Sequence, residues 1–227
     1  NQSNQIQSII HLADKGLNPN RKDSPTNVWS YHIEAEEVNS IYEEVNTLEK
    51  LDTWVNQGEE GENRSSIRDK VVDFLKDPSQ TRLYLPNSTS KELPDIFDDP
   101  CFVERLEFLD LSESSFSSLP SSIGELKALK YLDLFRSADI SLPKELGDLE
   151  SLETLDLCES SITSLPNSIG NLKSLRSLDL FKAPHLTALP SGILNLPKSC
   201  SVNVKECNFP ESITERLREI SSTSDYK

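Results

Sequence analysis

Four segments of the chain repeat one pattern of leucines, and their starting residues lie 23 positions apart. The pattern reads L-x-x-L-x-L, then an apolar residue, then L-P-x-x-I/L-x-x-L. An irregular unit precedes the four segments and a degenerate unit follows them. The segments begin at Leu106, Leu129, Leu152 and Leu175. Such a chain must bury its leucines by stacking one unit on the next, because a single unit has no core of its own.

This pattern is that of a leucine-rich repeat. In the Leu-x-Leu part, both leucines point to one face of a short strand, and the residue between them points to the other face. The L-P-x-x-I-G-x-L part predicts a return along the convex side as a short helical turn. Pro120 and its equivalents suit the first helical position, where no backbone N–H is needed. The predicted fold is an α/β leucine-rich-repeat solenoid with short parallel strands, convex helical turns and an N-terminal helical cap.

The terminal units of a solenoid expose apolar surface unless they are capped. Before the repeats, one predicted helix ends at Gly58 and a second ends before Pro78. The apolar face of the second helix consists of Ile67, Val71, Phe74 and Leu75. The predicted segments are 1–34 (N-terminal segment), 35–78 (helical cap or linker), 79–198 (leucine-rich repeats) and 199–227 (C-terminal cap and junction to a further domain).

Composition excludes several classes of function. The formal net charge is −15, which argues against a nucleic-acid binder and against adsorption to anionic lipid. No run of about 18 apolar residues predicts a membrane span. The four cysteines and three histidines do not follow metal-ligand spacing, so we expect no metal and no cofactor. The chain has no Met, so we expect it to be part of a longer or processed protein.

Both flanks of the repeats resemble a family of bacterial effectors. Residues 51–75, LDTWVNQGEEGENRSSIRDKVVDFL, resemble the helical linker of IpaH/SspH-type effectors, the "novel E3 ligase" (NEL) ubiquitin ligases. Residues 192–226, GILNLPKSCSVNVKECNFPESITERLREISSTSDY, are similar to the family's last repeat, closing cap and junction with the catalytic domain. The resemblance implies a type III secretion effector that a bacterium delivers into the host cytoplasm or nucleus.

The chain also departs from this family. Its repeats are longer than those of IpaH-type members and carry L-P-x-x-I-G-x-L, a form seen in plant disease-resistance proteins and in other bacterial effectors. The family's catalytic Cys-x-Asp motif is absent, since the residues two positions after the cysteines are Val103, Ser160, Val202 and Phe209. By resemblance, the chain is the substrate-binding part of an E3 ubiquitin ligase and not itself an enzyme. Its partners would be a host protein and the parent protein's own catalytic domain.

A second class of function stays open: a stand-alone recognition module of a plant-type immune receptor or a scaffold protein. In either case the residues beside the inward leucines project from the concave face in columns. The aromatic side chains among them predict an interface. The aspartate column is either part of that interface or a repeat consensus. The predicted partner-binding residues are Arg82, Tyr84, Phe108, Asp110, Tyr131, Asp133, Phe135, Arg136, Thr154, Asp156, Asp179, Phe181 and Lys182.

Overall fold

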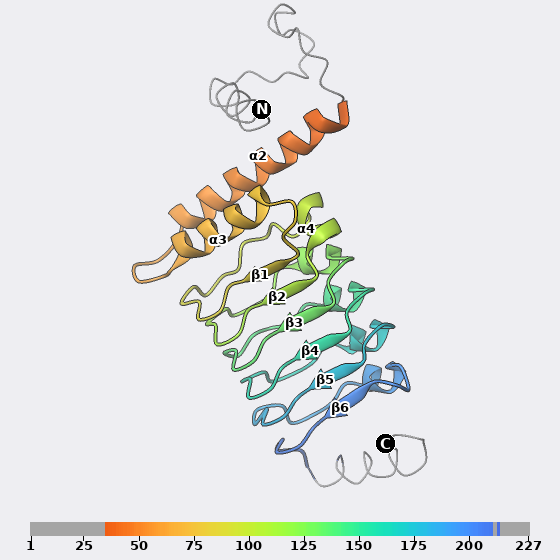
Figure 1. Cartoon of the computed structure of the whole chain (residues 1–227). Helices are drawn as coiled ribbons and strands as arrows, with labels where there is room; N and C mark the ends of the chain where they lie inside the picture. Colours follow the sequence, from red (N-terminus) through yellow and green to blue (C-terminus); the bar gives the residue numbers. More distant parts are fainter. Residues whose placement is uncertain (1–34, 211–212, 214–227) are drawn as a thin grey trace, which may run out of the picture. The chain divides into compact units, whose positions relative to one another are not determined.

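The computed structural model describes residues 35–210 and residue 213 (Figure 1). The predicted segment 1–34, and all of the expected C-terminal cap beyond residue 210 except Ile213, lie outside the described residues. The chain divides into two compact units, residues 1–49 and residues 50–227. Helix α2 (Ala35–Asn56) begins in the first unit, and its last residues belong to the second. The unit that contains the repeats is described below by itself.

Six parallel strands of three residues form one sheet in sequence order (Figure 1). They pair in register, so that the middle residue of each strand lies beside the middle residue of the next. From β2 to β5 this middle residue is a leucine with no exposed surface. The strands are β1 (Arg82–Tyr84), β2 (Phe108–Asp110), β3 (Tyr131–Asp133), β4 (Thr154–Asp156), β5 (Ser177–Asp179) and β6 (Ser201–Asn203). This is the predicted solenoid of short parallel strands.

The predicted helical turns are 3-10 helices of five residues. They are η1 (Ser121–Glu125), η2 (Lys144–Asp148), η3 (Asn167–Asn171) and η4 (Ser191–Asn195). The predicted position of the prolines was wrong by one residue, because Pro120 and its equivalents precede the first helical residue. Pro120 has extended geometry, and its carbonyl accepts the first hydrogen bond of the turn from Ile123 N at 3.1 Å.

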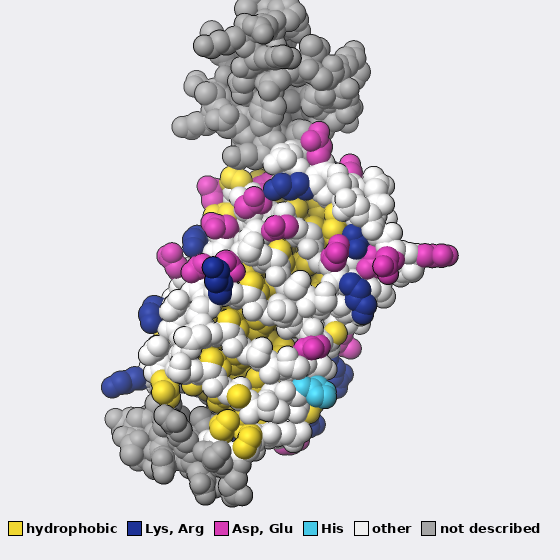
Figure 2. All heavy atoms as spheres, turned by 180° about the vertical axis from the view of Figure 1, so that it is seen from behind, with side chains coloured by type: hydrophobic (Ala, Val, Ile, Leu, Met, Phe, Trp, Pro, Cys, Tyr) yellow, Lys and Arg dark blue, Asp and Glu magenta, His cyan; other side chains and the backbone are white. Residues whose placement is uncertain are grey.

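The 3-10 helices of successive repeats pack closely through a glycine. A Cβ atom added at Gly147 would lie 2.4 Å from the carbonyl oxygen of Ser168 in the next repeat. Real Cβ atoms do not approach that closely, which explains the glycine in the L-P-x-x-I-G pattern. Seen from behind, apolar side chains form an interrupted strip that follows the repeats between charged side chains (Figure 2).

Helix α3 (Arg64–Lys76) and the last part of α2 form a layer, called here the helical layer, that covers the first repeat. In α3, the four residues predicted to share an apolar face are all buried. The ring of Phe74 stacks on Phe102 of α4 (Pro100–Arg105), with ring centroids 5.2 Å apart, and Phe97 meets Phe102 edge-on. Leu51 and Trp54, in the last part of α2, are also buried. That this layer is required for folding stays a prediction.

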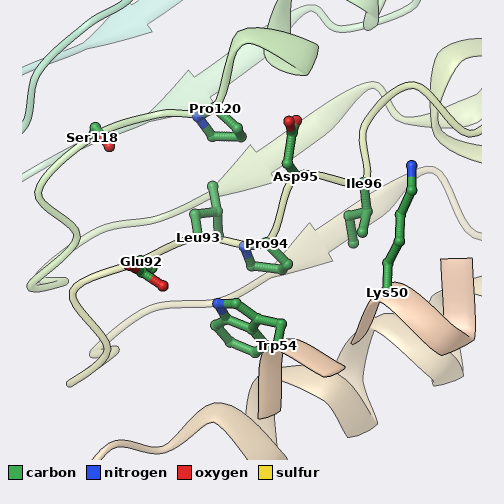
Figure 3. A pocket seen from close by; sticks show the side chains of 9 residues that line it. All are labelled: Lys50, Trp54, Glu92, Leu93, Pro94, Asp95, Ile96, Ser118 and Pro120. Atoms are coloured by element: carbon green, nitrogen blue, oxygen red, sulfur yellow. The ribbon is translucent and has the colours of Figure 1, made fainter. Parts of the chain in front are cut away.

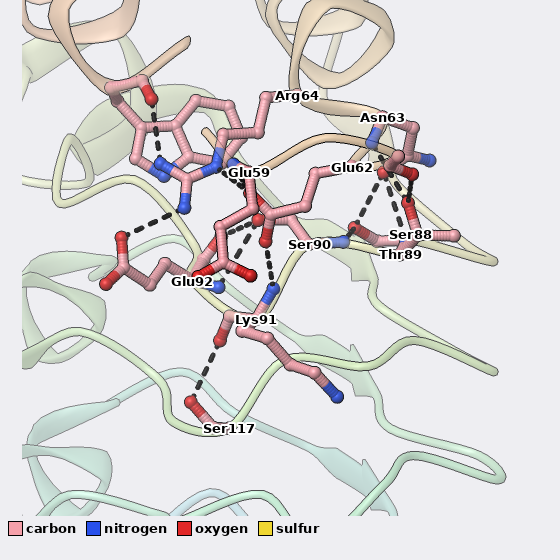
Figure 4. A network of polar contacts seen from close by, with 12 residues as sticks. Glu59, Glu62, Asn63, Arg64, Ser88, Thr89, Ser90, Lys91, Glu92 and Ser117 are labelled. Carbon is pink, nitrogen blue, oxygen red and sulfur yellow. Dashed lines mark hydrogen bonds and ion pairs between the residues drawn. The ribbon is translucent and has the colours of Figure 1, made fainter. Parts of the chain in front are cut away.

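Arg64 joins the start of α3 to the first repeat (Figure 4). Its guanidinium donates to Trp54 O at 2.7 Å and lies over the Trp54 ring, 4.8 Å from the centroid. The same group pairs with Glu62 at 2.7 Å and with Glu92, in the segment after β1, at 3.2 Å. An Arg side chain that is only 6% exposed requires such partners, because a buried unpaired charge is strongly destabilising.

Glu62 and Asn63 extend this contact (Figure 4). Glu62 accepts hydrogen bonds from Lys91 N and Glu59 N, both at 2.9 Å. Asn63 does not cap its own helix, and its side-chain oxygen accepts from Thr89 N at 3.0 Å. The hydrogen bonds from Lys91 N and Glu59 N and the nearby Arg64 lower the pKa of Glu62 from 4.5 to about 2.

We expect the helical layer to be part of the folding unit of the repeats. Deletion of residues 1–78 removes α3 and exposes Phe102 and the edge of β1. Truncation of one buried Phe lowers the free energy of unfolding by about 3–5 kcal/mol. Removal of the whole layer should therefore cost a large part of a typical domain stability of about 5–15 kcal/mol. The deletion should give an aggregated or unfolded product in thermal melts followed by circular dichroism. Deletion of residues 1–49 is the control and should keep a cooperative transition. A 79–227 chain that melts cooperatively at the control's temperature would contradict the expectation.

The lowered pKa of Glu62 predicts a pH dependence of stability. A carboxylate with a folded pKa below its unfolded pKa stabilises the fold above the unfolded value. Its contribution is lost as pH falls from about 4.5 to about 2. The Glu62→Gln variant should therefore be less stable than the wild type at pH 7, by about 2 kcal/mol for charge-assisted hydrogen bonds, and the difference should shrink at acid pH. Urea unfolding at a series of pH values measures this. A difference that does not change with pH would contradict it.

Candidate protein-interaction surface

The predicted concave face is the exposed face of the six-stranded sheet. In-register pairing places the first residues of the strands in one column and the third residues in another. The first column holds Arg82, Phe108, Tyr131 and Thr154, and the other holds Tyr84, Asp110, Asp133, Asp156 and Asp179. Phe135, Arg136, Phe181 and Lys182 follow the ends of β3 and β5. The structure thus brings the predicted residues together on one surface, and their use in binding stays a prediction.

An aromatic stack lies at the β1 end of this face. The ring of Phe108 is 4.8 Å from that of Tyr131 and nearly parallel to it, and it is 5.4 Å from the ring of Tyr84. The Arg82 guanidinium lies over Phe108, 4.6 Å from the ring centroid. The spacing of neighbouring strands, about 4.8 Å, matches the distance at which aromatic rings stack. The four side chains Arg82, Tyr84, Phe108 and Tyr131 form a preorganised, partly exposed platform, which we call the aromatic stack.

The aspartate column has a structural role. One carboxylate oxygen of each Asp accepts the backbone N–H two residues later, at 2.9 Å for Asp110, Asp133 and Asp156 and at 2.8 Å for Asp179. Such bonds turn the chain at the end of each strand, as Asp side chains commonly do. This finding favours the repeat-consensus interpretation for one oxygen of each carboxylate. The second oxygen is the part of the column that can meet a partner.

The middle of the aspartate column is electrostatically unfavourable. Burial, with further contributions from neighbouring carboxylates, raises the pKa of Asp133 and that of Asp156. Burial and the same carboxylates raise the pKa of Tyr131 to about 12, so its hydroxyl stays protonated and hydrogen-bonds Asp156. A cationic group placed here would relieve the repulsion between the carboxylates.

A second column follows the aspartates, and its left-handed backbone geometry was not predicted. Within the described residues, six non-glycine residues, one per repeat, have left-handed backbone geometry with φ between 50° and 59°. They are Asn87, Glu113, Arg136, Glu159, Lys182 and Glu206. Of these only Asn tolerates that region readily, so the Asp hydrogen bonds and the backbone bonds between repeats must hold it. A local signal existed in the sequence, since each of the six comes three residues after the last residue of a strand.

Opposite charges pair along this second column. Arg136 bonds Glu159 at 2.8 Å, and Lys182 lies 3.8 Å from Glu159 and 4.0 Å from Glu206. Each cation also covers the aromatic ring that precedes it: Arg136 lies 4.8 Å from the Phe135 centroid, and Lys182 lies 5.0 Å from the Phe181 centroid. The predicted interface residues at the ends of β3 and β5 are therefore held in place by neighbours within the repeats.

A pocket of about 350 Å³ lies between α2 and the segments that follow β1 and β2 (Figure 3). Trp54, Leu93, Pro94, Ile96 and Pro120 give it apolar walls, and Lys50, Glu92, Asp95 and Ser118 complete the lining. Trp54 Nε1 has no hydrogen-bond partner in the described part of the chain, but surrounding atoms cover it completely. None of the predicted site residues lies here. Because the unpaired Trp54 Nε1 is covered, the pocket is a weaker candidate than the concave face.

Residues 35–210 contain neither a metal cluster nor a membrane-spanning helix. No group of three or more His, Cys, Asp or Glu side chains there is arranged to hold a metal ion. No helix described in the structure has the length and apolar character needed to cross a membrane. The four cysteines are free thiols, and Cys207 Sγ lies 2.9 Å from Leu180 O.

A family model described as "Leucine-rich repeat region" matches residues 109–221. The chain carries a leucine-rich-repeat region. Together with the parallel sheet, this confirms the predicted fold class. Among curated proteins, none matches the chain significantly in sequence.

Several solved structures are similar to the repeat region. A leucine-rich-repeat protein of Leptospira interrogans is 25% identical with a TM-score of 0.42, over 65% of this chain and 48% of that one. The ectodomain of the Arabidopsis thaliana receptor kinase SOBIR1 is 19% identical with a TM-score of 0.42, over 56% and 69% of the two chains. A chain of the A. thaliana BIR3–SERK2 complex is 26% identical with a TM-score of 0.43, over 56% and 68%. This chain thus spans about half the length of the Leptospira chain.

Proposed function

We propose that the chain recognises a protein partner through its concave face. The observation that carries this proposal is the aromatic stack, in which Tyr84 is 45% exposed and Phe108 and Tyr131 are only half-buried. Preorganised aromatic and Arg side chains are the groups that most often dominate binding energy at protein interfaces. Leucine-rich-repeat solenoids present such extended concave surfaces to their partners.

Charge specifies the kind of partner. The carboxylates of Asp110, Asp133, Asp156 and Asp179 lie in one column beside the aromatic side chains, and the whole chain has a net charge of −15. The oxygens of this column that do not bond the backbone are the ones that a cation would meet, although the Asp156 carboxylate also bonds the Tyr131 hydroxyl. A partner with a basic surface would associate faster, and its association would slow with added salt.

We further propose that the chain is the substrate-recognition part of a bacterial effector ubiquitin ligase. The resemblance of residues 51–75 and 192–226 to IpaH/SspH-type effectors supports this proposal. The partner would then be a host protein, met inside the host cell after secretion from a bacterium. The catalytic domain of the parent protein, outside this chain, would transfer ubiquitin to that partner and would itself be a second partner.

The second candidate is a stand-alone recognition module of a plant-type receptor or a scaffold. The repeat form agrees with it, since the 23-residue unit with L-P-x-x-I-G-x-L is seen in plant disease-resistance proteins, as well as in other bacterial effectors. The coding sequence downstream separates the two candidates. A helical domain with a Cys-x-Asp motif supports the ligase, and its absence supports the module.

We expect this chain by itself to form no ubiquitin thioester. Burial is the main cause that raises the pKa of all four thiols, to about 11 for Cys158 and Cys200, so they stay protonated at neutral pH. A protonated thiol is a poor nucleophile. Incubation with ubiquitin-charged E2 and non-reducing electrophoresis should show no adduct that disappears with dithiothreitol. A known NEL catalytic domain serves as the positive control. An adduct on any cysteine of the chain would overturn the expectation.

Truncation of the aromatic stack should weaken binding without unfolding the chain. Aromatic anchors commonly contribute 2 kcal/mol or more, so Phe108→Ala combined with Tyr131→Ala should lower affinity at least about thirtyfold. Proteins retained from eukaryotic cell extracts by the wild type are compared with those retained by the variant, and each protein that is lost is then titrated. Leu194→Ala, at an exposed position of η4, is the matched control. Equal affinity for a folded double variant would move the site away from the concave face.

A further inference from the structure

One column of the concave face alternates large and small side chains with a period of two repeats. Its members, each two residues after the end of a strand, are Ser112, Phe135, Cys158, Phe181 and Lys205. Backbone bonds from Arg136 N to Cys158 O at 3.0 Å and from Glu159 N to Phe181 O at 2.7 Å keep these positions side by side. Phe135 and Phe181 therefore lie two strand spacings apart, about 10 Å, with the small Cys158 between them.

The Glu159 carboxylate pairs with the two cations that lie over the rings of Phe135 and Phe181. Arg136 covers Phe135 and bonds Glu159 at 2.8 Å, while Lys182 covers Phe181 and lies 3.8 Å from the same Glu159. Glu159 directly follows Cys158, so the ion pairs bridge the gap at its rim. Both cations are therefore paired with Glu159, and the two rings are held in place before any partner protein binds.

The floor of the gap is small and uncharged. The backbone N–H of Cys158 is bound by Asp156, which fixes the turn below it. Burial and the nearby Asp179 and Asp156 raise the pKa of the Cys158 thiol to about 11, so the side chain is a neutral thiol at physiological pH. A neutral thiol behaves as a small hydrophobic group.

We propose that Phe135, Cys158 and Phe181 form a socket for one large apolar side chain, such as Leu, Met or Phe, from a protein segment bound along the concave face. This inference rests on the proposed function and names the anchor of the partner. The distance of about 10 Å between the positions of Phe135 and Phe181 admits one side chain, because packed apolar groups lie about 4–5 Å apart. The carboxylates of Asp156 and Asp179 beside the socket match a basic residue next to that anchor. The partner segment is therefore an apolar anchor flanked by positive charge.

Disulfide exchange at Cys158 tests the socket without the partner. The wild-type chain is equilibrated with an equal mixture of bis(2-phenylethyl) disulfide and bis(2-hydroxyethyl) disulfide in the presence of both free thiols. In each exchange the Cys158 sulfur forms a mixed disulfide and one small thiol is released. Peptide mass spectrometry then gives the ratio of phenylethyl to hydroxyethyl adduct at this cysteine alone.

The comparison site is Ser112→Cys, at the equivalent position two repeats earlier, where Pro86 takes the place of one aromatic wall. We expect the ratio at Cys158 to exceed that at position 112 at least about tenfold, and to fall to that level in the Phe135→Ala/Phe181→Ala variant. Equal ratios at the two sites would overturn the socket.

A second measurement uses the proteins that the wild-type chain retains from eukaryotic cell extracts. Cys158→Phe fills the socket and should weaken binding at least about tenfold, whereas Cys158→Ser leaves it open and should change binding less than about threefold. The two proposals fail separately. If Phe108→Ala/Tyr131→Ala weakens binding but Cys158→Phe does not, the concave face stands and the socket is wrong. If the exchange preference is found but neither variant affects binding, the proposed function is wrong.

Discussion

Parallel pairing between successive repeats is the interaction on which the rest of the structure depends. Each strand has three residues, too few to be stable alone, and each inner strand is completed by a neighbour on both sides. The pairing places Leu109, Leu132, Leu155 and Leu178 in one fully buried row. Burial of that row is the main gain of stacking, and it is possible only in a single register, since a shift by one residue would turn the leucines outward.

The same register organises the exposed face. Because every repeat places equivalent residues about 4.8 Å from those of its neighbour, any feature of the repeat becomes a column. This spacing suits aromatic rings, which stack at Phe108 and Tyr131. It does not suit carboxylates: burial first, and then the neighbouring carboxylates, raise the pKa of Asp133 and that of Asp156. A surface that holds ordered aromatic groups beside crowded carboxylates is complementary to apolar and basic groups of a protein.

The repeats also require an edge that is closed at the β1 side. Arg64, Glu62 and Asn63 bond the segment after β1, and the rings of Phe74 and Phe102 stack beneath them. This layer combines a polar network with an apolar contact, so the first repeat has partners for both its backbone groups and its leucines. The stretch that carries Trp54, Glu62 and Arg64 is the one that resembles the linker of effector ligases. In this structure the charged residues Glu62 and Arg64 attach the helical layer to the first repeat.

Alternation of side chains along the chain was enough to determine the strands, the inward leucines, the turns and the columns of the concave face. These features depend on the direction of successive Cβ atoms, which follows from local geometry. The structure accordingly places the predicted interface residues together on the exposed face of the sheet, and their use in binding stays a prediction. The backbone hydrogen bond that each aspartate accepts had a local signal in the sequence as well, because an Asp that begins a turn commonly accepts the N–H two residues later.

Other features were decided only by the tertiary structure. The pairing of Arg136 with Glu159 and the ion pair of Arg64 with Glu92 join residues that lie 23 or more positions apart along the chain. The sequence shows that these residues are charged but not which of them meet. Their partners depend on how far each repeat shifts and turns relative to the last, and that is set by the packing of glycines and leucines throughout the stack.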